Sequence, residues 1–166
     1  MNIGFVGAGL MGGPLARNLI RAGKNVLVHD LSEEAITRTL AAGTSGKCAK
    51  NLDELGACDL VFTSLPLPQH VQEVMSGANG LYVKMKKGSI HVELSTIDPK
   101  TAEGLADEAK SKGIAYIQST LGKTPNHAEK AEEPMFIGGD QDAIKKLEDI
   151  FKIIGLPYNV GSIAAS

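Results

Sequence analysis

Hydrophobic and polar positions alternate along the chain in two regular patterns. Short apolar runs that end at glycine or at polar residues are typical of buried strands. These runs cover residues 3–6, 26–28, 60–62, 90–94, 114–117, 135–137 and 158–160. Longer segments repeat apolar residues at helical spacing and have capping residues or glycine at their ends. The predicted helices cover residues 10–22, a segment that begins at Ser32, and residues 69–75, 98–112 and 143–154.

Strand and helix alternate over nearly the whole length of the chain. This alternation predicts an α/β fold: a Rossmann-type, doubly wound, mainly parallel sheet with helices on both faces. Such sheets bind ligands beyond the carboxyl ends of their strands, where the strand order reverses. The motifs described next all follow a predicted strand, so we expect them to meet along this edge.

The first predicted strand is followed at once by the pattern G-x-G-x-x-G, which opens the first predicted helix. Gly7 permits a tight turn, Gly9 lets a pyrophosphate approach the backbone, and Gly12 lets the helix pack closely on the strand. The free N–H groups of the helix then face the phosphates. A plain connecting turn is the alternative, but the strand and helix on either side favour a dinucleotide site. Its candidate residues are Gly7, Ala8, Gly9, Leu10, Met11 and Gly12.

Asp30 closes the second predicted strand. A carboxylate at this position accepts hydrogen bonds from the adenosine ribose and repels the 2′-phosphate of NADP. Leu31 and Ser32 follow it, and neither is an arginine that would bind such a phosphate. NAD is therefore the expected cofactor and NADP is disfavoured. A purely capping role for Asp30 stays open.

The composition narrows the class of protein further. A chain of 166 residues with 43% hydrophobic and 22% charged residues is typical of one soluble globular domain. Its formal net charge of −2 gives no basic field, so we expect neither nucleic acid nor a membrane as a partner. The N-terminus resembles no targeting signal, so the cytoplasm is the expected location, or an organelle after loss of a presequence.

No metal site is expected, because Cys48 and Cys58 and the four histidines lack metal-ligand spacing. His91 lies in a predicted strand beside Val92 and is expected to be a satisfied sheet residue. His127 is the only histidine close in sequence to the loop at residues 122–124.

Four segments together resemble the β-hydroxyacid dehydrogenases, a family that includes 3-hydroxyisobutyrate dehydrogenase, tartronate semialdehyde reductase and relatives of 6-phosphogluconate dehydrogenase. The segments are FVGAGLMG at 5–12, DLVFTSLP at 59–66, ELSTIDP at 93–99 and FIGG at 136–139. They occur in the family's order and extend over essentially the whole chain. The resemblance implies an oxidoreductase that transfers hydride between nicotinamide and a short 3-hydroxy acid or its semialdehyde.

The resemblance also implies two further contacts with the cofactor. Leu65 and Pro66 are expected on the adenosine side, and Thr96 near the nicotinamide ribose. Each position also has a simpler interpretation that stays open. Pro66 can merely stop a strand, and Ser95-Thr96 can merely be the turn before the helix that begins at Asp98-Pro99.

Residues 122–124 depart from the usual family pattern. Many members have Ser-Gly-Gly in a substrate loop where this chain has Gly122, Lys123 and Thr124. Sulfolactaldehyde reductases of the same family carry a similar Gly-Arg-Thr. The charge of Lys123 and the hydroxyl of Thr124 suit the terminal anion of a small hydroxy acid or aldehyde, and Asn126 and His127 can extend such a pocket. That Lys123 is only a solvated loop lysine stays open.

The family's catalytic lysine, in a G-x-x-x-K-x-x-x-N pattern, has no counterpart here. After Ser162 only residues 163–166 remain. No catalytic residue is therefore expected in this chain, and the resemblance implies that the catalytic lysine lies beyond Ser166.

This interpretation divides the chain into a dinucleotide-binding domain over residues 1–162 and the start of an interdomain segment at 163–166, with no C-terminal helical domain. The chain alone is expected to be inactive, and a homo-oligomer is expected at full length. A free-standing dinucleotide-binding or sensor module is the main alternative, and an imine reductase or oxidative decarboxylase is a weaker one.

Overall fold

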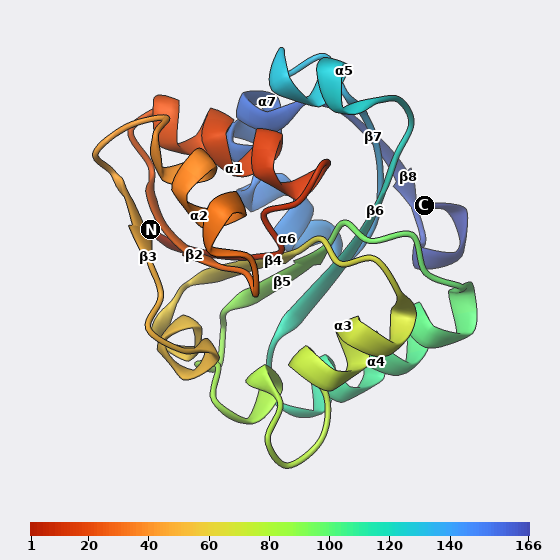
Figure 1. The fold of residues 1–166 in the computed structure, drawn as a ribbon. Coiled ribbons are helices and arrows are strands. Elements are labelled where there is room, and N and C mark those ends of the chain that lie inside the picture. Colours follow the sequence, from red (N-terminus) through yellow and green to blue (C-terminus); the bar gives the residue numbers. More distant parts are fainter.

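The computed structural model describes residues 1–166 as a single eight-stranded sheet with helices on both faces (Figure 1). The strands are β1 (Asn2–Val6), β2 (Asn25–His29), β3 (Gly46–Cys48), β4 (Leu60–Thr63), β5 (Ile90–Glu93), β6 (Ala115–Leu121), β7 (Pro134–Gly139) and β8 (Leu156–Gly161). The α-helices are α1 (Gly12–Arg21), α2 (Glu33–Leu40), α3 (Pro68–Met75), α4 (Pro99–Ser111), α5 (Pro125–Glu129), α6 (Gln141–Lys146) and α7 (Glu148–Ile154). Three short 3₁₀ helices are η1 (Leu52–Ala57), η2 (Leu81–Val83) and η3 (Ile163–Ala165).

The order of strands in the sheet is β3-β2-β1-β4-β5-β6-β7-β8. All neighbours are parallel except β6 and β7, which pair antiparallel. The chain runs outward from β1 through β2 to β3 and then returns to place β4 on the other side of β1. The strand order therefore reverses between β1 and β4, which is where such sheets bind ligands. The predicted doubly wound, mainly parallel fold is confirmed.

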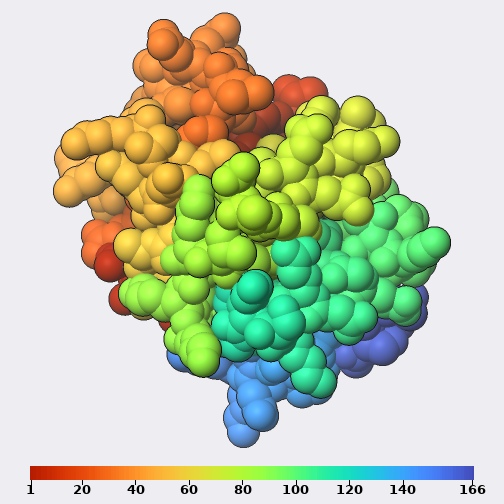
Figure 2. Space-filling model, turned by 90° about the horizontal axis from the view of Figure 1, so that it is seen from below, coloured from red at the N-terminus to blue at the C-terminus, as the bar shows by residue number.

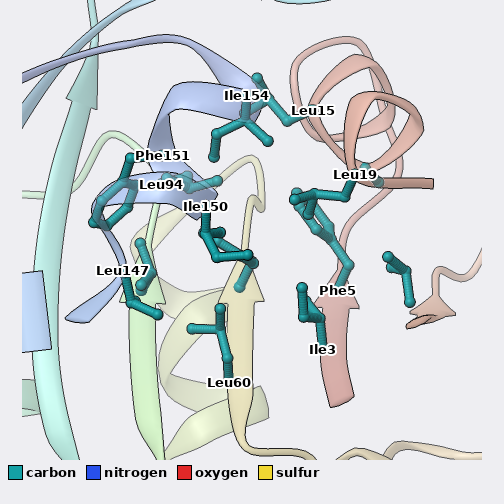
Figure 3. Packing of buried hydrophobic residues seen from close by; sticks show 14 of the residues in the cluster. Ile3, Phe5, Leu15, Leu19, Leu60, Leu94, Leu147, Ile150, Phe151 and Ile154 are labelled. Atoms are coloured by element: carbon teal, nitrogen blue, oxygen red, sulfur yellow. The ribbon is translucent and has the colours of Figure 1, made fainter. Parts of the chain in front are cut away.

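Apolar side chains on both faces of the sheet produce two cores. On one face, α1 and α7 lie over the strands, and Figure 3 shows Leu15 and Leu19 of α1 opposite Ile150 and Ile154 of α7. On the other face, η1, α3, η2 and α4 cover the sheet with a smaller apolar cluster. Figure 2 shows that residues from the middle of the chain, coloured yellow to green, dominate the view from below. Burial on both faces explains why the central strands are continuous apolar runs.

The predicted helix over 143–154 is wrong in one respect, because it is two helices. α6 ends at Lys146 and α7 begins at Glu148. Between them, the N–H of Leu147 is shared by the carbonyls of Ala143 and Ile144, at 3.0 and 3.2 Å. This turn is tighter than an α-helical turn, and the Leu147 side chain is fully buried in the core.

Other differences concern segments without a strong hydrophobic pattern. The edge strand β3 and the short helices α5 and η1 were not expected, and β6 extends beyond Ile117 to Leu121. The first three residues of this extension are polar, and β7 pairs with it as far as Met135. None of the helices combines the length and the apolar character needed to cross a bilayer.

Candidate functional site

A cleft of about 840 Å³ opens at the carboxyl ends of the central strands, over the reversal of strand order between β1 and β4. All the residues predicted to bind the cofactor line it, except Ala8. They are Gly7, Gly9, Leu10, Met11, Gly12, Asp30, Leu65, Pro66 and Thr96. Sequence positions from four separate βα connections thus meet in one place.

The three glycines of the fingerprint have different geometric roles. Gly7 has φ +94°, and a Cβ there would lie 2.0 Å from the carbonyl oxygen of Ser64. A Cβ at Gly12 would lie 2.0 Å from the carbonyl oxygen of Gly7. At Gly9, by contrast, a Cβ would meet no atom within 4 Å. The loop itself requires Gly7 and Gly12, whereas the space above Gly9 is left open to the cleft.

Helix α1 begins at the cleft without a cap. Met11, its N-cap residue, makes no side-chain capping bond, and the first turn contains no acidic residue. The unpaired N–H groups and the positive end of the helix dipole therefore lie beside the cleft lining at Met11 and Gly12. This arrangement complements an anion such as a phosphate.

Asp30 links the glycine loop to the connection between β2 and α2. Its Oδ2 accepts a hydrogen bond from the amide of Ala8 at 2.7 Å, and its Oδ1 accepts one from the amide of Ser32 at 2.8 Å. Each carboxylate oxygen has a second lone pair, and Asp30 lines the cleft. The residue thus has a capping role and is also available to a ligand. Ala8 is buried and contributes its amide to Asp30.

The loop over residues 122–124 brings one side chain to the cleft. Lys123 lines the cleft, and its backbone amide donates to Oε1 of buried Glu133 at 2.6 Å. Gly122 does not line the cleft; its amide donates to the carbonyl of Pro134 at 3.0 Å. Thr124 does not line it either, and its hydroxyl pairs with Nδ1 of His127 at 2.9 Å. Asn126 is also outside the lining.

The C-terminal residue, Ser166, lies outside the cleft lining. Its hydroxyl donates to the carbonyl of Ile163 at 2.7 Å, and this bond closes the short turn of η3. A catalytic lysine beyond Ser166 lies outside the described residues and stays a prediction. The division of the chain into a domain over residues 1–162 and an interdomain segment over 163–166 also stays a prediction.

A family model described as the NAD-binding domain of 6-phosphogluconate dehydrogenase matches residues 2–161. This chain belongs to that family. The resemblance to the β-hydroxyacid dehydrogenases is confirmed, since curated relatives bear those names.

Similar proteins are dehydrogenases of small hydroxy acids by name. The 2-(hydroxymethyl)glutarate dehydrogenase of Eubacterium barkeri is 32% identical over 99% of this chain and 55% of its own length. The NAD-dependent L-serine dehydrogenase of Pseudomonas aeruginosa is 31% identical over 92% of this chain and 51% of its own length. The chain spans about half the length of these curated relatives.

A solved 3-hydroxyisobutyrate dehydrogenase from Salmonella typhimurium superposes with a TM-score of 0.88. The two are 24% identical, and the match covers 98% of this chain and 56% of that one. The likeness shows that the two chains share the fold.

In this NAD-binding domain the short helix α5, which follows Lys123, is fastened to α1. Glu129 of α5 pairs with Arg17 and Arg21 of α1, and these bonds, led by the one from Arg17, hold the pKa of Glu129 below its usual value. The Asn18 side chain donates to the carbonyl of Ala128 at 2.7 Å. The loop that carries Lys123 is therefore tied to the helix that begins at the cleft.

The NAD-binding domain also contains buried polar residues in and beside the sheet, and among them the sequence predicted a buried role only for His91. Tyr82, His91, Thr63, Glu93 and Ser95 form a line of hydrogen bonds, which we call the buried polar chain. The Tyr82 hydroxyl lies 2.6 Å from His91 Nδ1, and His91 Nε2 lies 2.7 Å from Thr63 Oγ1. Thr63 Oγ1 lies 2.5 Å from Glu93 Oε2, and Glu93 Oε1 accepts from the Ser95 amide at 2.6 Å.

Burial is the main cause of the pKa shifts in the buried polar chain. It raises the pKa of Glu93 to about 7, against the opposing hydrogen bonds from Ser95 and Thr63, and it lowers the pKa of His91 to about 3. It also raises the pKa of Tyr82, so that hydroxyl stays protonated. The available signal was the presence of polar residues inside otherwise apolar strands. His91 is the satisfied sheet residue that the sequence predicted.

Other lining residues were missed as cleft residues because they lie on helices or in short loops without a motif. Among them are Leu52 of η1, and His70, Glu73 and Val74 of α3. No group of three or more His, Cys, Asp or Glu side chains lies close enough together to hold a metal ion.

Proposed function

We propose that this chain is the cofactor-binding part of a dehydrogenase that moves hydride between NAD(H) and a small hydroxy acid or its semialdehyde. One observation carries the proposal: an open cleft joins the uncapped start of α1, the empty space above Gly9 and the Asp30 carboxylate. The names of the relatives from Eubacterium barkeri and Pseudomonas aeruginosa support a hydroxy-acid substrate.

The cofactor fits the cleft in one direction. The pyrophosphate takes the position above Gly9, where the α1 dipole and free amides stabilise its charge. The adenosine ribose bonds to the remaining lone pairs of Asp30, beside Leu65 and Pro66. The nicotinamide ribose then lies near Thr96, because β5 is farther from β2 in the sheet than β1 and β4 are.

Charge in the cleft favours NAD over NADP. A 2′-phosphate would lie beside the Asp30 carboxylate. Lys123 is the only lysine or arginine among the lining residues. It follows β6, and β1, β4 and β5 separate that strand from β2. The one available cation is therefore at the wrong end of the cleft to compensate a 2′-phosphate.

The same separation supports a position of Lys123 at the nicotinamide end, where we expect the substrate to bind. Its ammonium attracts an anionic group of the substrate. Gly122 and Thr124 do not line the cleft, and we expect them to affect substrate binding only by shaping the loop that carries Lys123. The protein's work in this domain is to position the cofactor and the anion, and the chemistry of hydride transfer belongs to the nicotinamide. A general acid or base, which we expect to be a lysine, comes from beyond Ser166.

A matched pair of glycine variants tests this proposal. Gly9→Ala adds a methyl group in open space, so the domain stays folded, but the methyl occupies the position of the pyrophosphate. Gly104→Ala adds the same methyl in open space on α4, away from the cleft lining. Calorimetric titration with NADH should show binding to the unmodified chain and to Gly104→Ala. Gly9→Ala should bind at least about tenfold more weakly, a loss of about 1.4 kcal/mol. Equal binding by all three folded proteins would refute the proposed site.

A further inference from the structure

The buried polar chain ends at the two loops that flank the cleft. The Ser95 amide donates to Glu93, and the Ser95 hydroxyl accepts from the Leu65 amide at 2.8 Å. The Gln118 side chain donates to the Ser95 carbonyl at 3.2 Å. Leu65 and Thr96, the residue after Ser95, both line the cleft. Ser95 is therefore the junction between the interior of the sheet and the walls of the cleft.

The donors and acceptors of this chain can be assigned when Glu93 is ionised. A carboxylate accepts only, so Thr63 donates its one O–H to Glu93. Thr63 then accepts from Nε2–H of His91, and Nδ1 of His91 accepts from the Tyr82 hydroxyl. Every group is satisfied, and His91 is the Nε2–H tautomer.

One added proton reverses these bonds. Oε1 of Glu93 still accepts from Ser95, so the proton resides on Oε2 and is donated to Thr63. Thr63 then donates to Nε2 of His91, whose proton lies on Nδ1 and is donated to the Tyr82 oxygen. The Tyr82 O–H must turn away from His91, its one partner in the structure, so this state leaves a buried donor unpaired. The imidazole stays neutral throughout, but its tautomer changes.

No positive charge holds Glu93 in the ionised state. The titratable groups that interact electrostatically within the buried polar chain are His91 on β5, Tyr82 on η2 and Tyr116 on β6. Glu108 on α4 affects it through Tyr82. His91 lies 3.6 Å from Glu93 and is neutral near pH 7. Ionised Glu93 gives the Ser95 amide a charge-assisted bond, and protonation weakens that bond.

We propose that Glu93 is a positioning residue of the cofactor site: its carboxylate anchors Ser95 and, through Ser95, the loops of Leu65 and Thr96, and its protonation reverses the buried polar chain and loosens both loops. The proposal rests on the proposed function, because these loops contact the cofactor only if NAD binds in the cleft. NADH affinity should therefore fall as the pH drops through the neutral range.

The first experiment follows the His91 tautomer by ¹⁵N NMR of the cofactor-free chain between pH 5 and pH 8.5. We expect Nε2–H at high pH and Nδ1–H at low pH. Glu93→Gln should fix Nδ1–H at every pH, because the new amide group always donates to Thr63. Thr63→Val should break the coupling and abolish the switch. Glu103, exposed on α4, has no contact with the buried polar chain, so Glu103→Gln should behave like the unmodified chain. A tautomer that is constant with pH in the unmodified chain would overturn the proposal.

The second experiment measures NADH affinity over the same pH range. We expect a several-fold weakening toward pH 5.5 in the unmodified chain and in Glu103→Gln. Glu93→Gln should bind weakly with a flatter profile, and Ser95→Ala should also lose much of the pH dependence while keeping the tautomer switch. His29 and His70 also line the cleft, but they are present in every variant, so the difference between profiles reports Glu93.

The two experiments separate the possible failures. Unchanged pH dependence in Glu93→Gln, with a normal tautomer switch in the unmodified chain, would overturn the positioning role and leave the cofactor site intact. A tautomer switch with no NADH binding at any pH would overturn the proposed function, and the positioning role with it.

Discussion

The two ends of the cleft are built in different ways. At the end near Asp30, where we propose that adenosine binds, backbone amides, the start of α1 and glycines that admit no Cβ determine the shape. At the other end, an exposed lysine protrudes from a loop that is held by buried Glu133 and by the pairing of Glu129 with α1. The end proposed for the adenosine of the cofactor is thus shaped by backbone geometry, and the end proposed for the substrate is shaped by a replaceable side chain.

The largest effect is expected where backbone geometry leaves no room. Gly12→Ala places a Cβ 2.0 Å from the carbonyl oxygen of Gly7, so the loop or the helix must shift. Urea unfolding should show a loss of roughly 1–3 kcal/mol or more. Gly104→Ala is the matched control and should be neutral or stabilising by up to about 1 kcal/mol. A stable Gly12→Ala chain with full NADH affinity would break the contrast between the two ends.

The buried polar chain, which lies in neither end of the cleft, offers a pH test of stability. Glu93 has a raised pKa, so its contribution to stability is lost as the pH rises from its ordinary value of 4.5 to about 7. His91 has a lowered pKa, so its contribution is lost as the pH falls from 6.5 to about 3. Between pH 4.5 and 6.5 the two slopes oppose each other.

Glu93→Gln should remove one of these slopes. Relative to the unmodified chain, the free energy of unfolding of the variant should then fall by about 1.4 kcal/mol for each pH unit of acidification in this window. Urea unfolding at several pH values measures the difference, and groups such as Glu129 affect both proteins equally. Parallel curves for the two proteins would contradict the titration of buried Glu93.

A smaller effect is expected at Asp30. The unmodified chain should prefer NADH to NADPH several-fold, because one close pair of like charges costs about 1 kcal/mol or more near a protein surface. Asp30→Ala should weaken NADH binding and narrow the preference. Paired titrations with the two cofactors measure both quantities. Equal affinities in the unmodified chain would show that Asp30 only caps the glycine loop.

The smallest effect on cofactor binding is expected at Lys123. In the full-length protein, Lys123→Ala should raise KM for an anionic substrate, reduce discrimination against a neutral analogue and leave NADH affinity unchanged. Lys130, at the end of α5 and outside the cleft lining, provides the control variant Lys130→Ala. Steady-state kinetics at two salt concentrations measure the effect, since salt screens the attraction. Unchanged selectivity in Lys123→Ala would make Lys123 a solvated surface lysine.

Local signals in the sequence predicted the parts of the fold that depend on neighbouring residues. The Ser32 side chain caps α2 by accepting from Ala35, and Asp98 caps α4 by accepting from Thr101, as the sequence indicated. The glycine loop was also predictable, because its turn and its approach to a helix are local. The order of strands was not, because it depends on which distant segments pair.

Side-chain contacts between residues far apart in the sequence could not be predicted from local patterns. Glu93 is an ordinary strand residue until Thr63, on a different strand, lies beside it. Glu133 has no pattern that links it to Lys123, although it holds that residue's amide. Leu147 fits a continuous helical pattern, but in the structure its N–H is shared by two carbonyls and its side chain is buried in the core. The positions of these side chains are decided by tertiary contacts, which hydrophobic periodicity does not report.

The most direct test of the account is to locate the cofactor by NMR on the ¹⁵N-labelled chain. During titration with NAD⁺, the largest amide shifts should occur at Gly9, Met11 and Gly12, with smaller ones near Asp30 and Thr96. Amides of α4 around Gly104 should not move. Saturable shifts centred on the start of α1 would establish the backbone site. Absence of shifts at millimolar NAD⁺ in a folded chain, or shifts centred elsewhere, would contradict it.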